Sequence, residues 1–421
     1  MTGQQLPTII VGAGLAGLSC ARYLHDAGAP FVVLEAADAV GGRVRTDEID
    51  GFKCDRGFQV LLTAYPEAMK QLDYESLNLK PFIAGSLIRK GGRFHRFIDP
   101  WRHPFDGIKS AFGGVGSLFD KARIAKLRSR STRSTIESLF EEDESTTLDA
   151  LRGYGFSESM IDGFFRPFLG GVFLERDLQT SSRVLHFVFR MFSQGSAALP
   201  SAGMQAIPEQ MAARLGDGNV RLKSEVAEMT ATSVGLTNGE QIEASQVVLA
   251  TDAFSASKIL KTTEPKPDRR VFCLYFAADE TPVSDPILVL NGDGNGPINN
   301  LCVPTFVSPD YAPAGQHLVS VSVLEHSATD LSTLEDAVRK QACEWFGSAV
   351  DTWRHLKTYD IPHALPDQLV GKNATPGRST SQDGIIVCGD HIGNASIQSA
   401  LESGKHAAEQ ILNTSSSAAV A

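Results

Sequence analysis

The hydrophobic pattern opens with two short apolar runs on either side of a helical repeat. Thr8 to Val11 are β-branched and apolar, which is typical of a buried parallel strand. Leucines and alanines then recur at helical spacing until Gly28, which ends the predicted helix. A second apolar run follows at Phe31 to Leu34. This order of strand, helix and strand predicts a parallel βαβ unit at the start of the chain.

A glycine-rich turn joins the first strand to the helix. Gly12, Gly14 and Gly17 follow the order G-x-G-x-x-G, and Glu35 ends the second strand, 23 residues after Gly12. Such glycines allow a tight turn, a close approach to a pyrophosphate and close helix–strand packing, and the acid accepts hydrogen bonds from a ribose. The helix N-terminus offers N–H groups to the phosphates. The stretch therefore predicts a dinucleotide site, and a chance glycine-rich turn is the less favoured alternative.

The rest of the pattern predicts further turns, helices and strands. Hairpins are expected at Asp50-Gly51 and Gly91-Gly92, and a loop at 103–116. Helices are expected at 118–138, 146–154, 158–168, 334–345 and 396–412. Strands are expected at 220–222, 225–230, 233–237, 245–250, 271–277, 287–290, 300–303, 317–323 and 384–388.

This order of elements predicts an α/β protein with two interleaved domains. The length of 421 residues also exceeds that of one ordinary domain. Residues 1–80, 199–260 and 370–412 are expected to form a Rossmann-type nucleotide-binding domain. The insertions 81–198 and 261–369 are expected to form an α+β substrate domain, and 413–421 a disordered tail.

Composition narrows the classes of partner and compartment. The net charge of −10 argues against nucleic acid as a partner. The six cysteines include no C-x-x-C pair, so no metal site is expected, and Cys20 and Cys388 are expected to be buried, reduced thiols of a cytoplasmic protein. Neither a signal peptide nor a membrane span is expected. The oligomeric state stays open.

Two clusters each have two interpretations. The first is a cluster of basic residues on the helix expected at 118–138. It is either a solvated helix face or a surface for peripheral contact with an anionic membrane. Its members are Lys121, Arg123, Lys126, Arg128, Arg130 and Arg133. The second is a cluster of phenylalanines. These residues either pack in the core or form the wall of an apolar pocket. They are Phe164, Phe165, Phe168, Phe173, Phe187, Phe189 and Phe192.

Several motifs taken together resemble a known superfamily. The glycine turn, Glu35, Gly41-Gly42-Arg43 and Gly389-Asp390 resemble the FAD-dependent amine oxidase, protoporphyrinogen oxidase and phytoene desaturase superfamily over nearly the whole length. The segments 57–72 and 395–408 are similar to plant- and cyanobacterial-type carotene desaturases and to related squalene-processing flavoproteins. The resemblance implies a glutathione-reductase-like FAD domain and non-covalent FAD, because 361–368 holds no cysteine for a covalent link.

The resemblance also implies a set of cofactor contacts. Gly42 and Arg43 are expected at the pyrophosphate, and Asp390 at the region between pyrophosphate and ribityl chain. Residues 57–60 are expected along the flavin ring and Val226 at the adenine. The helix that begins near Ser396 is expected to direct its N–H groups at the flavin N1/O2 edge, where they stabilise the negative charge of the reduced flavin. The expected cofactor-binding residues are Gly12, Ala13, Gly14, Leu15, Ala16, Gly17, Glu35, Ala36, Gly42, Arg43, Gly57, Phe58, Gln59, Val60, Val226, Asp390, Ser396, Ile397 and Gln398.

Two departures from the superfamily pattern argue against an amine oxidase activity. Phe272 stands where such enzymes often carry a lysine near flavin N5, and Ser396 stands where they carry one of two aromatic residues. The expected function is therefore transfer of a hydride from a C–H bond of an apolar, isoprenoid- or carotenoid-like small molecule to flavin N5. An amine oxidase or a protoporphyrinogen-oxidase-like enzyme that uses oxygen is the alternative, and a flavin-binding sensor is a third. No catalytic side chain is identified, because the ten histidines are isolated.

Overall fold

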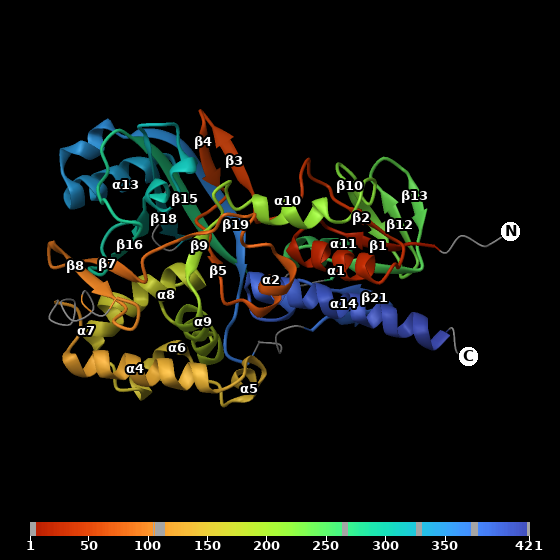
Figure 1. The fold of residues 1–421 in the computed structure, drawn as a ribbon, viewed down its shortest axis with the longest axis horizontal. Helices are drawn as coiled ribbons and strands as arrows, with labels where there is room; N and C mark the ends of the chain where they lie inside the picture. Colours follow the sequence, from red (N-terminus) through yellow and green to blue (C-terminus); the bar gives the residue numbers. More distant parts are fainter. Residues whose placement is uncertain are drawn as a thin grey trace.

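Two sheets, each built from distant parts of the chain, organise the fold (Figure 1). The computed structural model describes residues 6–103, 105, 114–262, 268–325, 331–371 and 378–418. In Figure 1 the first sheet lies on one side of the molecule with α1 (Leu15–Asp26) and α14 (Ile397–Ala418), and the second lies on the other side with α13 (Leu331–Phe346). Most of the loop expected at 103–116 falls outside the described residues, which there comprise only 103, 105 and 114–116.

The first sheet has the strand order β10-β2-β1-β14-β21-β20. Its strands are β1 (Thr8–Val11), β2 (Phe31–Leu34), β10 (Val220–Arg221), β14 (Gln246–Leu249), β20 (Thr380–Gln382) and β21 (Ile385–Val387). β1 pairs in parallel with both β2 and β14, and β20 runs antiparallel to β21. The predicted βαβ unit is therefore confirmed. Because the strand order changes direction at β1, its carboxyl end is the switch point at which such sheets bind ligands.

Helices α1 and α14 pack against each other beside the first sheet, and their backbones come close at Gly404. Ser19 Oγ in α1 donates to the carbonyl oxygen of Leu401 in α14 at 2.6 Å. A Cβ on Gly404 would lie only 2.1 Å from the carbonyl oxygen of Ala16. α14 continues to Ala418 and so includes 413–418 of the expected tail, and 419–421 lie outside the described residues.

Smaller elements surround the first sheet. The hairpin expected at Asp50-Gly51 is confirmed as β3 (Thr46–Ile49) with β4 (Phe52–Asp55). The strands expected at 225–230 and 233–237 are confirmed as β11 (Val226–Met229) and β12 (Ser233–Leu236), and β13 (Gln241–Glu243) pairs antiparallel with β12. A short sheet in the order β5-β9-β6 joins Leu61–Leu62, Ala197–Leu199 and Lys80–Pro81. The helices here are α2 (Pro66–Gln71), α10 (Ala206–Ala213) and α11 (Ala253–Ile259).

The second sheet has the order β19-β15-β18-β17-β16-β7-β8. Its strands are β7 (Gly85–Lys90), β8 (Arg93–Ile98), β15 (Asp268–Ala278), β16 (Leu288–Asn291), β17 (Ile298–Cys302), β18 (His317–Leu324) and β19 (Arg354–Pro366). β7 pairs in parallel with β16, so the hairpin expected at Gly91-Gly92 extends a sheet made by a much later segment. Phe272, Leu274 and Phe276 pack with α13 against one face.

A group of helices completes this side of the molecule. They are α4 (Leu118–Arg133), α5 (Ile136–Glu141), α6 (Thr147–Gly153), α7 (Glu158–Met160), a π-helix (Ile161–Phe165), α8 (Arg166–Phe173), α9 (Ser182–Gln194) and the short α12 (Pro304–Val307). The single helix expected at 118–138 is two helices, because Ser134 is extended and Thr135 caps α5. None of the described helices is long and apolar enough to cross a membrane.

Candidate functional site

A cavity of about 1310 Å³ is lined by residues of both sheets. At one end it meets the carboxyl ends of the parallel strands, where Gly12, Glu35, Thr251 and Gly389 follow β1, β2, β14 and β21. This is the switch point of the first sheet. Pockets for one small ligand usually measure about 300–1,000 Å³. The larger volume is therefore enough for a cofactor and a second molecule.

The turn before α1 leaves space and N–H groups for a phosphate. No side chain caps this helix, and its N-cap residue Gly14 has φ −72°. A Cβ built on Gly14 would meet nothing within 4 Å, whereas one on Gly17 would lie 2.0 Å from the Gly12 carbonyl oxygen. The uncapped N-terminus with open space beside it fits a pyrophosphate.

Glu35 is held in place by two backbone amides. Its Oε2 accepts from Ala13 N at 2.7 Å, and its Oε1 accepts from Ala37 N at 2.9 Å. An ionised carboxylate has about four acceptor positions, so each oxygen can accept one further bond, as two ribose hydroxyls require. Ala36 also lines the cavity, whereas Ala13 and Gly17 lie behind its wall.

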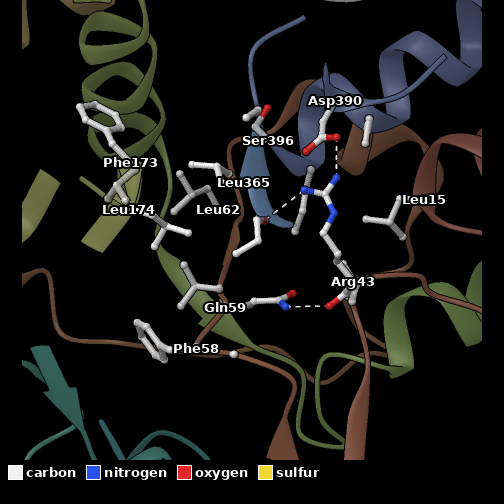
Figure 2. A pocket seen from close by; sticks show the side chains of 18 of the residues that line it. Leu15, Arg43, Phe58, Gln59, Leu62, Phe173, Leu174, Leu365, Asp390 and Ser396 are labelled. Atoms are coloured by element: carbon white, nitrogen blue, oxygen red, sulfur yellow. Dashed lines mark hydrogen bonds and ion pairs between the residues drawn. The ribbon is translucent and has the colours of Figure 1, made fainter. Parts of the chain in front are cut away.

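Arg43 and Asp390 face each other across the polar part of the cavity (Figure 2). Arg43 Nη2 lies 2.5 Å from Asp390 Oδ1, and Nη1 donates to the carbonyl oxygen of Ala364 at 3.1 Å. Burial favours the neutral guanidinium, but the nearby Asp390 carboxylate outweighs this and raises the pKa of Arg43. Gln59 Nε2 donates to the carbonyl oxygen of Arg43 at 2.8 Å, so the Gln59 side chain braces this loop.

The start of α14 also reaches the cavity. Ser396 and Ile397 line it, and Ser396 Oγ accepts from Ser399 N at 3.1 Å, as an N-cap does. The prediction for Gln398 concerned the N–H groups at the start of this helix. Its side chain is buried away from the cavity and accepts from Glu67 N at 2.8 Å. Val226 and residues 57–60 do line the cavity.

The other end of the cavity is apolar. Figure 2 shows Phe58, Leu62, Phe173, Leu174 and Leu365 on the side opposite Arg43. Further lining aromatic residues are Phe164, Phe168, Phe187, Phe189 and Phe192. Phe165 instead packs in the core against Phe156. Both interpretations of the phenylalanine cluster therefore hold for different members.

Phe272 does not face the cavity, which corrects its expected place near the flavin. It packs against the α13 side of β15, and neighbouring Val271 lines the cavity instead. Alternation along the strand puts Cys273 on the same face as Val271. Neither of these side chains is a cation, so this strand has no lysine in the place that such amine oxidases often use near flavin N5.

Sequence reasoning missed the lining residues of three strands. Asn300 lies on β17, Ser322 on β18, and Ile361, Ala364 and Leu365 on β19. The serines of HLVSVSV alternate with valines at 317–323, so one polar face of that strand could have been recognised.

The arginines of α4 are largely engaged in ion pairs. Arg123 lies 3.3 Å from Asp120, Arg128 lies 3.3 Å from Asp99, and Arg130 lies 2.9 Å from Glu142. These pairs favour the structural interpretation of the basic helix over a purely electrostatic contact with lipid.

Within the described residues, the cysteines form neither a disulfide nor a metal site. All six cysteines are free, and Cys20 and Cys388 are buried as expected. Burial raises the pKa of Cys20 and of Cys388, which keeps both thiols protonated. In the described ranges, no group of three His, Cys, Asp or Glu residues is placed to hold a metal ion.

Comparisons with known proteins agree with this geometry. The model of the family described as flavin containing amine oxidoreductase matches residues 15–412. A 15-cis-phytoene desaturase from Synechococcus elongatus is 38% identical over 118 residues, 26% of this chain and 23% of that protein. A putrescine oxidase from Kocuria rosea is 26% identical over 266 residues, 60% of this chain and 55% of that protein. Each match therefore spans less than two thirds of the relative's length.

The fold likeness extends much further than the sequence likeness. The solved structure of an oxidoreductase from Methanosarcina mazei is similar with a TM-score of 0.75 at 17% identity, over 97% of this chain and 100% of that one. At this level of identity the likeness shows the fold alone. It confirms a mixed α/β chain of this architecture over nearly its whole length.

Proposed function

Because the chain belongs to the flavin-containing amine oxidoreductase family, we propose that it uses non-covalent FAD to take a hydride from a C–H bond of an apolar, isoprenoid- or carotenoid-like molecule. The observation that carries the proposal is the aromatic and aliphatic wall that continues the dinucleotide end of the cavity. The bound flavin supplies the hydride acceptor, its N5 atom. The protein supplies binding, orientation and exclusion of water.

The proposed contacts begin at the adenosine half of the cofactor. Glu35 accepts the ribose hydroxyls, and Val226 lies at the adenine. The N-terminus of α1 and the bare backbone of Gly14 and Gly42 bind the pyrophosphate, whose charge Arg43 balances. Supporting this arrangement, a Cβ on Gly42 would lie 3.4 Å from Gly14 Cα, so the two glycines face each other closely.

The flavin half is assigned to the other end of the same wall. Residues 57–60 follow the ring, Asp390 lies toward the ribityl chain, and the N-terminus of α14 at Ser396 and Ile397 faces the N1/O2 edge. A helix N-terminus there stabilises the negative charge of the reduced form. Three of the expected residues support the cofactor site indirectly. Ala13 donates to Glu35, and Gly17 packs on Gly12. Gln398 accepts from Glu67 in α2.

The division of the strands supports the proposed domains. Every strand of the first sheet lies within 1–80, 199–260 and 370–412, which we assign to a glutathione-reductase-like FAD-binding domain. Every strand of the second sheet lies within 81–198 and 261–369, which we assign to the substrate domain.

Oxidation of an amine or a porphyrinogen with oxygen is the second candidate. It is favoured by the match to the Kocuria putrescine oxidase, which spans more of this chain than the match to the phytoene desaturase. The cavity lining argues against it, because Ser396 stands where the superfamily's amine oxidases carry an aromatic ring, and Val271, the residue of the corresponding strand that lines the cavity, is not a cation.

Anaerobic mixing of the holoenzyme with candidate substrates tests the proposal. We expect loss of flavin absorbance with acyclic isoprenoids or polyenes and no loss with polyamines. Release of hydrogen peroxide in air is scored in parallel for amines and porphyrinogens. Flavin bleaching by an amine or a porphyrinogen, together with no response to any apolar substrate, would overturn the proposal.

We further propose that the protein contacts a membrane surface peripherally, beside the cavity. Trp101, Leu118 and Phe119 are 50%, 61% and 75% exposed, and Trp101 also lines the cavity. Large apolar side chains at such exposure favour insertion at the edge of a bilayer. Because three of the four α4 arginines are in ion pairs, the contact is proposed to depend on apolar insertion rather than on lipid charge.

A further inference from the structure

The face of the second sheet that turns toward the cavity is unexpectedly polar. On β18, Val319, Val321 and Val323 pack with α13. Alternation turns Ser320 and Ser322 to the opposite face, although that face is buried too. Asn300 on β17 is the register partner of Ser322 and shares this face. Polar side chains on a buried sheet face need hydrogen-bond partners, so each one requires an explanation.

Asn300 and Ser322 are two polar residues of this sheet that line the cavity. Their exposed fractions are 3% and 6%. Asn300 Nδ2 donates to Ser322 Oγ at 3.2 Å, and Asn300 Oδ1 accepts from Asn299 Nδ2 at 2.9 Å. The amide has two N–H donors and the hydroxyl has one O–H donor. Within the described part of the chain, the second N–H of Asn300 and the O–H of Ser322 have no recorded acceptor.

Helix α8 approaches this pair closely and has a glycine at the point of contact. Gly171 of α8 also lines the cavity, and a Cβ there would lie 3.0 Å from Asn300 Oδ1. A second polar atom nearby, Asn299 Oδ1, is buried without a hydrogen bond. Spare donors on buried side chains that line a cavity cost free energy unless a ligand accepts from them.

We propose that Asn300 and Ser322 bind one neutral oxygen of the substrate. The substrate is then an apolar molecule that carries a hydroxyl, ether or carbonyl oxygen, rather than a plain hydrocarbon. Two neutral donors suit a neutral acceptor, because an anionic group would find no cation in this pair. This inference rests on the proposed function, and it narrows the substrate class of that same site.

Binding of a matched pair of ligands to the holoenzyme tests the inference. Geranylgeraniol and the corresponding hydrocarbon without the hydroxyl group are titrated without oxygen, and binding is followed by perturbation of the flavin spectrum. One net hydrogen bond corresponds to about a 10-fold change in affinity. We expect the alcohol to bind about 10-fold more tightly than the hydrocarbon.

Three variants of one strand separate recognition from structure. Ser322→Ala is expected to weaken binding of the alcohol about 10-fold and to leave the hydrocarbon unchanged. Ser322→Thr keeps the hydroxyl and is expected to restore binding of the alcohol. Ser320→Ala is the matched control, because Ser320 lies on the same face but outside the cavity lining and meets Cys273 Sγ at 3.6 Å.

The outcomes distinguish this inference from the proposed function. Equal binding of alcohol and hydrocarbon by the wild type, or an equal loss of both in Ser322→Ala, overturns the inference and leaves the proposed function standing. Flavin reduction by amines, with no response to either isoprenoid, overturns the proposed function and the inference with it.

Discussion

At the scale of single residues, two glycines of one turn have different roles. Gly17 is required by packing, because a Cβ there would lie 2.0 Å from the Gly12 carbonyl oxygen. Gly14 has φ −72° and open space where its Cβ would be, so nothing in the protein itself requires a glycine there. The pyrophosphate proposed for that space is what would require it.

Alanine substitutions separate these two roles. Gly14→Ala is expected to leave the free energy of unfolding of the apoprotein unchanged and to lower FAD affinity at least about 10-fold. Gly17→Ala is expected to lower that free energy by about 3 kcal/mol, because backbone atoms must move apart. Thermal melts of the apoprotein and FAD titration measure the two effects. A destabilised Gly14→Ala apoprotein, or one that binds FAD normally, would contradict this assignment.

Asp55 is a buried carboxylate next to the segment that lines the cavity. It accepts hydrogen bonds from Thr46 Oγ1 at 2.5 Å, Met204 N at 3.0 Å and Tyr311 OH at 3.0 Å. Burial raises the pKa of Asp55 to about 6, and these hydrogen bonds oppose it only in part. The carboxyl group therefore holds its proton more tightly in the folded protein than in the unfolded chain.

This raised pKa predicts a loss of stability as the pH rises. Between about pH 4 and pH 6 the folded state binds more protons than the unfolded state, so the contribution of Asp55 falls across that window and is constant above it. Relative to Asp55→Asn, the wild-type free energy of unfolding is expected to fall by about 2 kcal/mol from pH 4 to pH 7. Denaturant titrations measure this difference, with Asp310→Asn as the surface control. A difference that stays constant or grows with pH refutes it.

The residues that could be predicted from sequence are those whose partners lie nearby in a known turn. Gly12, Gly14 and Glu35 needed only the local order of strand, turn and helix. The partner of the Gln398 side chain could not be predicted, because Glu67 N lies 331 residues away in the chain. Phe272 was misplaced by one residue of strand register, and such a shift turns a side chain to the opposite face.

At the scale of elements, long periodic segments were predictable, whereas the edge strand β19 was not. β19 was missed because Pro362 and Pro366 interrupt its pattern. The structure explains why these prolines are tolerated, since β19 is an edge strand of the second sheet and one of its sides needs no ladder donors. This missed strand carries three lining residues, so the apolar part of the site was incomplete in the sequence reading.

The exposed tip of α4 carries the prediction for membrane contact. Leu118→Ser with Phe119→Ser is expected to lower partition onto neutral lipid vesicles at least about 10-fold, because two large apolar side chains are lost from the contact. Co-sedimentation with vesicles measures partition, and added salt is expected to have little effect. Met69→Ser removes an equally apolar exposed side chain from α2 and is the matched control. Binding that depends on anionic lipid and disappears in salt would contradict contact by insertion.

At the scale of the whole molecule, the cavity connects parts of the chain that are distant in sequence. Its wall runs from Val11 in the first strand to Ala400 in the last helix and takes residues from both sheets. Sequence alone indicated two interleaved sets of segments, because the composition changes at their borders. It could not show that one cavity spans both, since that depends on how the two sheets are placed in space.

A shared cavity predicts that FAD stabilises both parts of the molecule together. All three tryptophans, Trp101, Trp345 and Trp353, lie in the proposed substrate domain, so their fluorescence reports its unfolding while flavin fluorescence reports cofactor release. At 100 times the dissociation constant, FAD adds about 2.7 kcal/mol, which raises the tryptophan-detected Tm of a chain this long by about 3 °C. Arg43→Gln is expected to require more FAD for the same shift, and Arg221→Gln, in an exposed pair with Glu240, is the control. If the tryptophan-detected Tm does not change with FAD, and flavin is released at a different temperature, the two domains unfold independently.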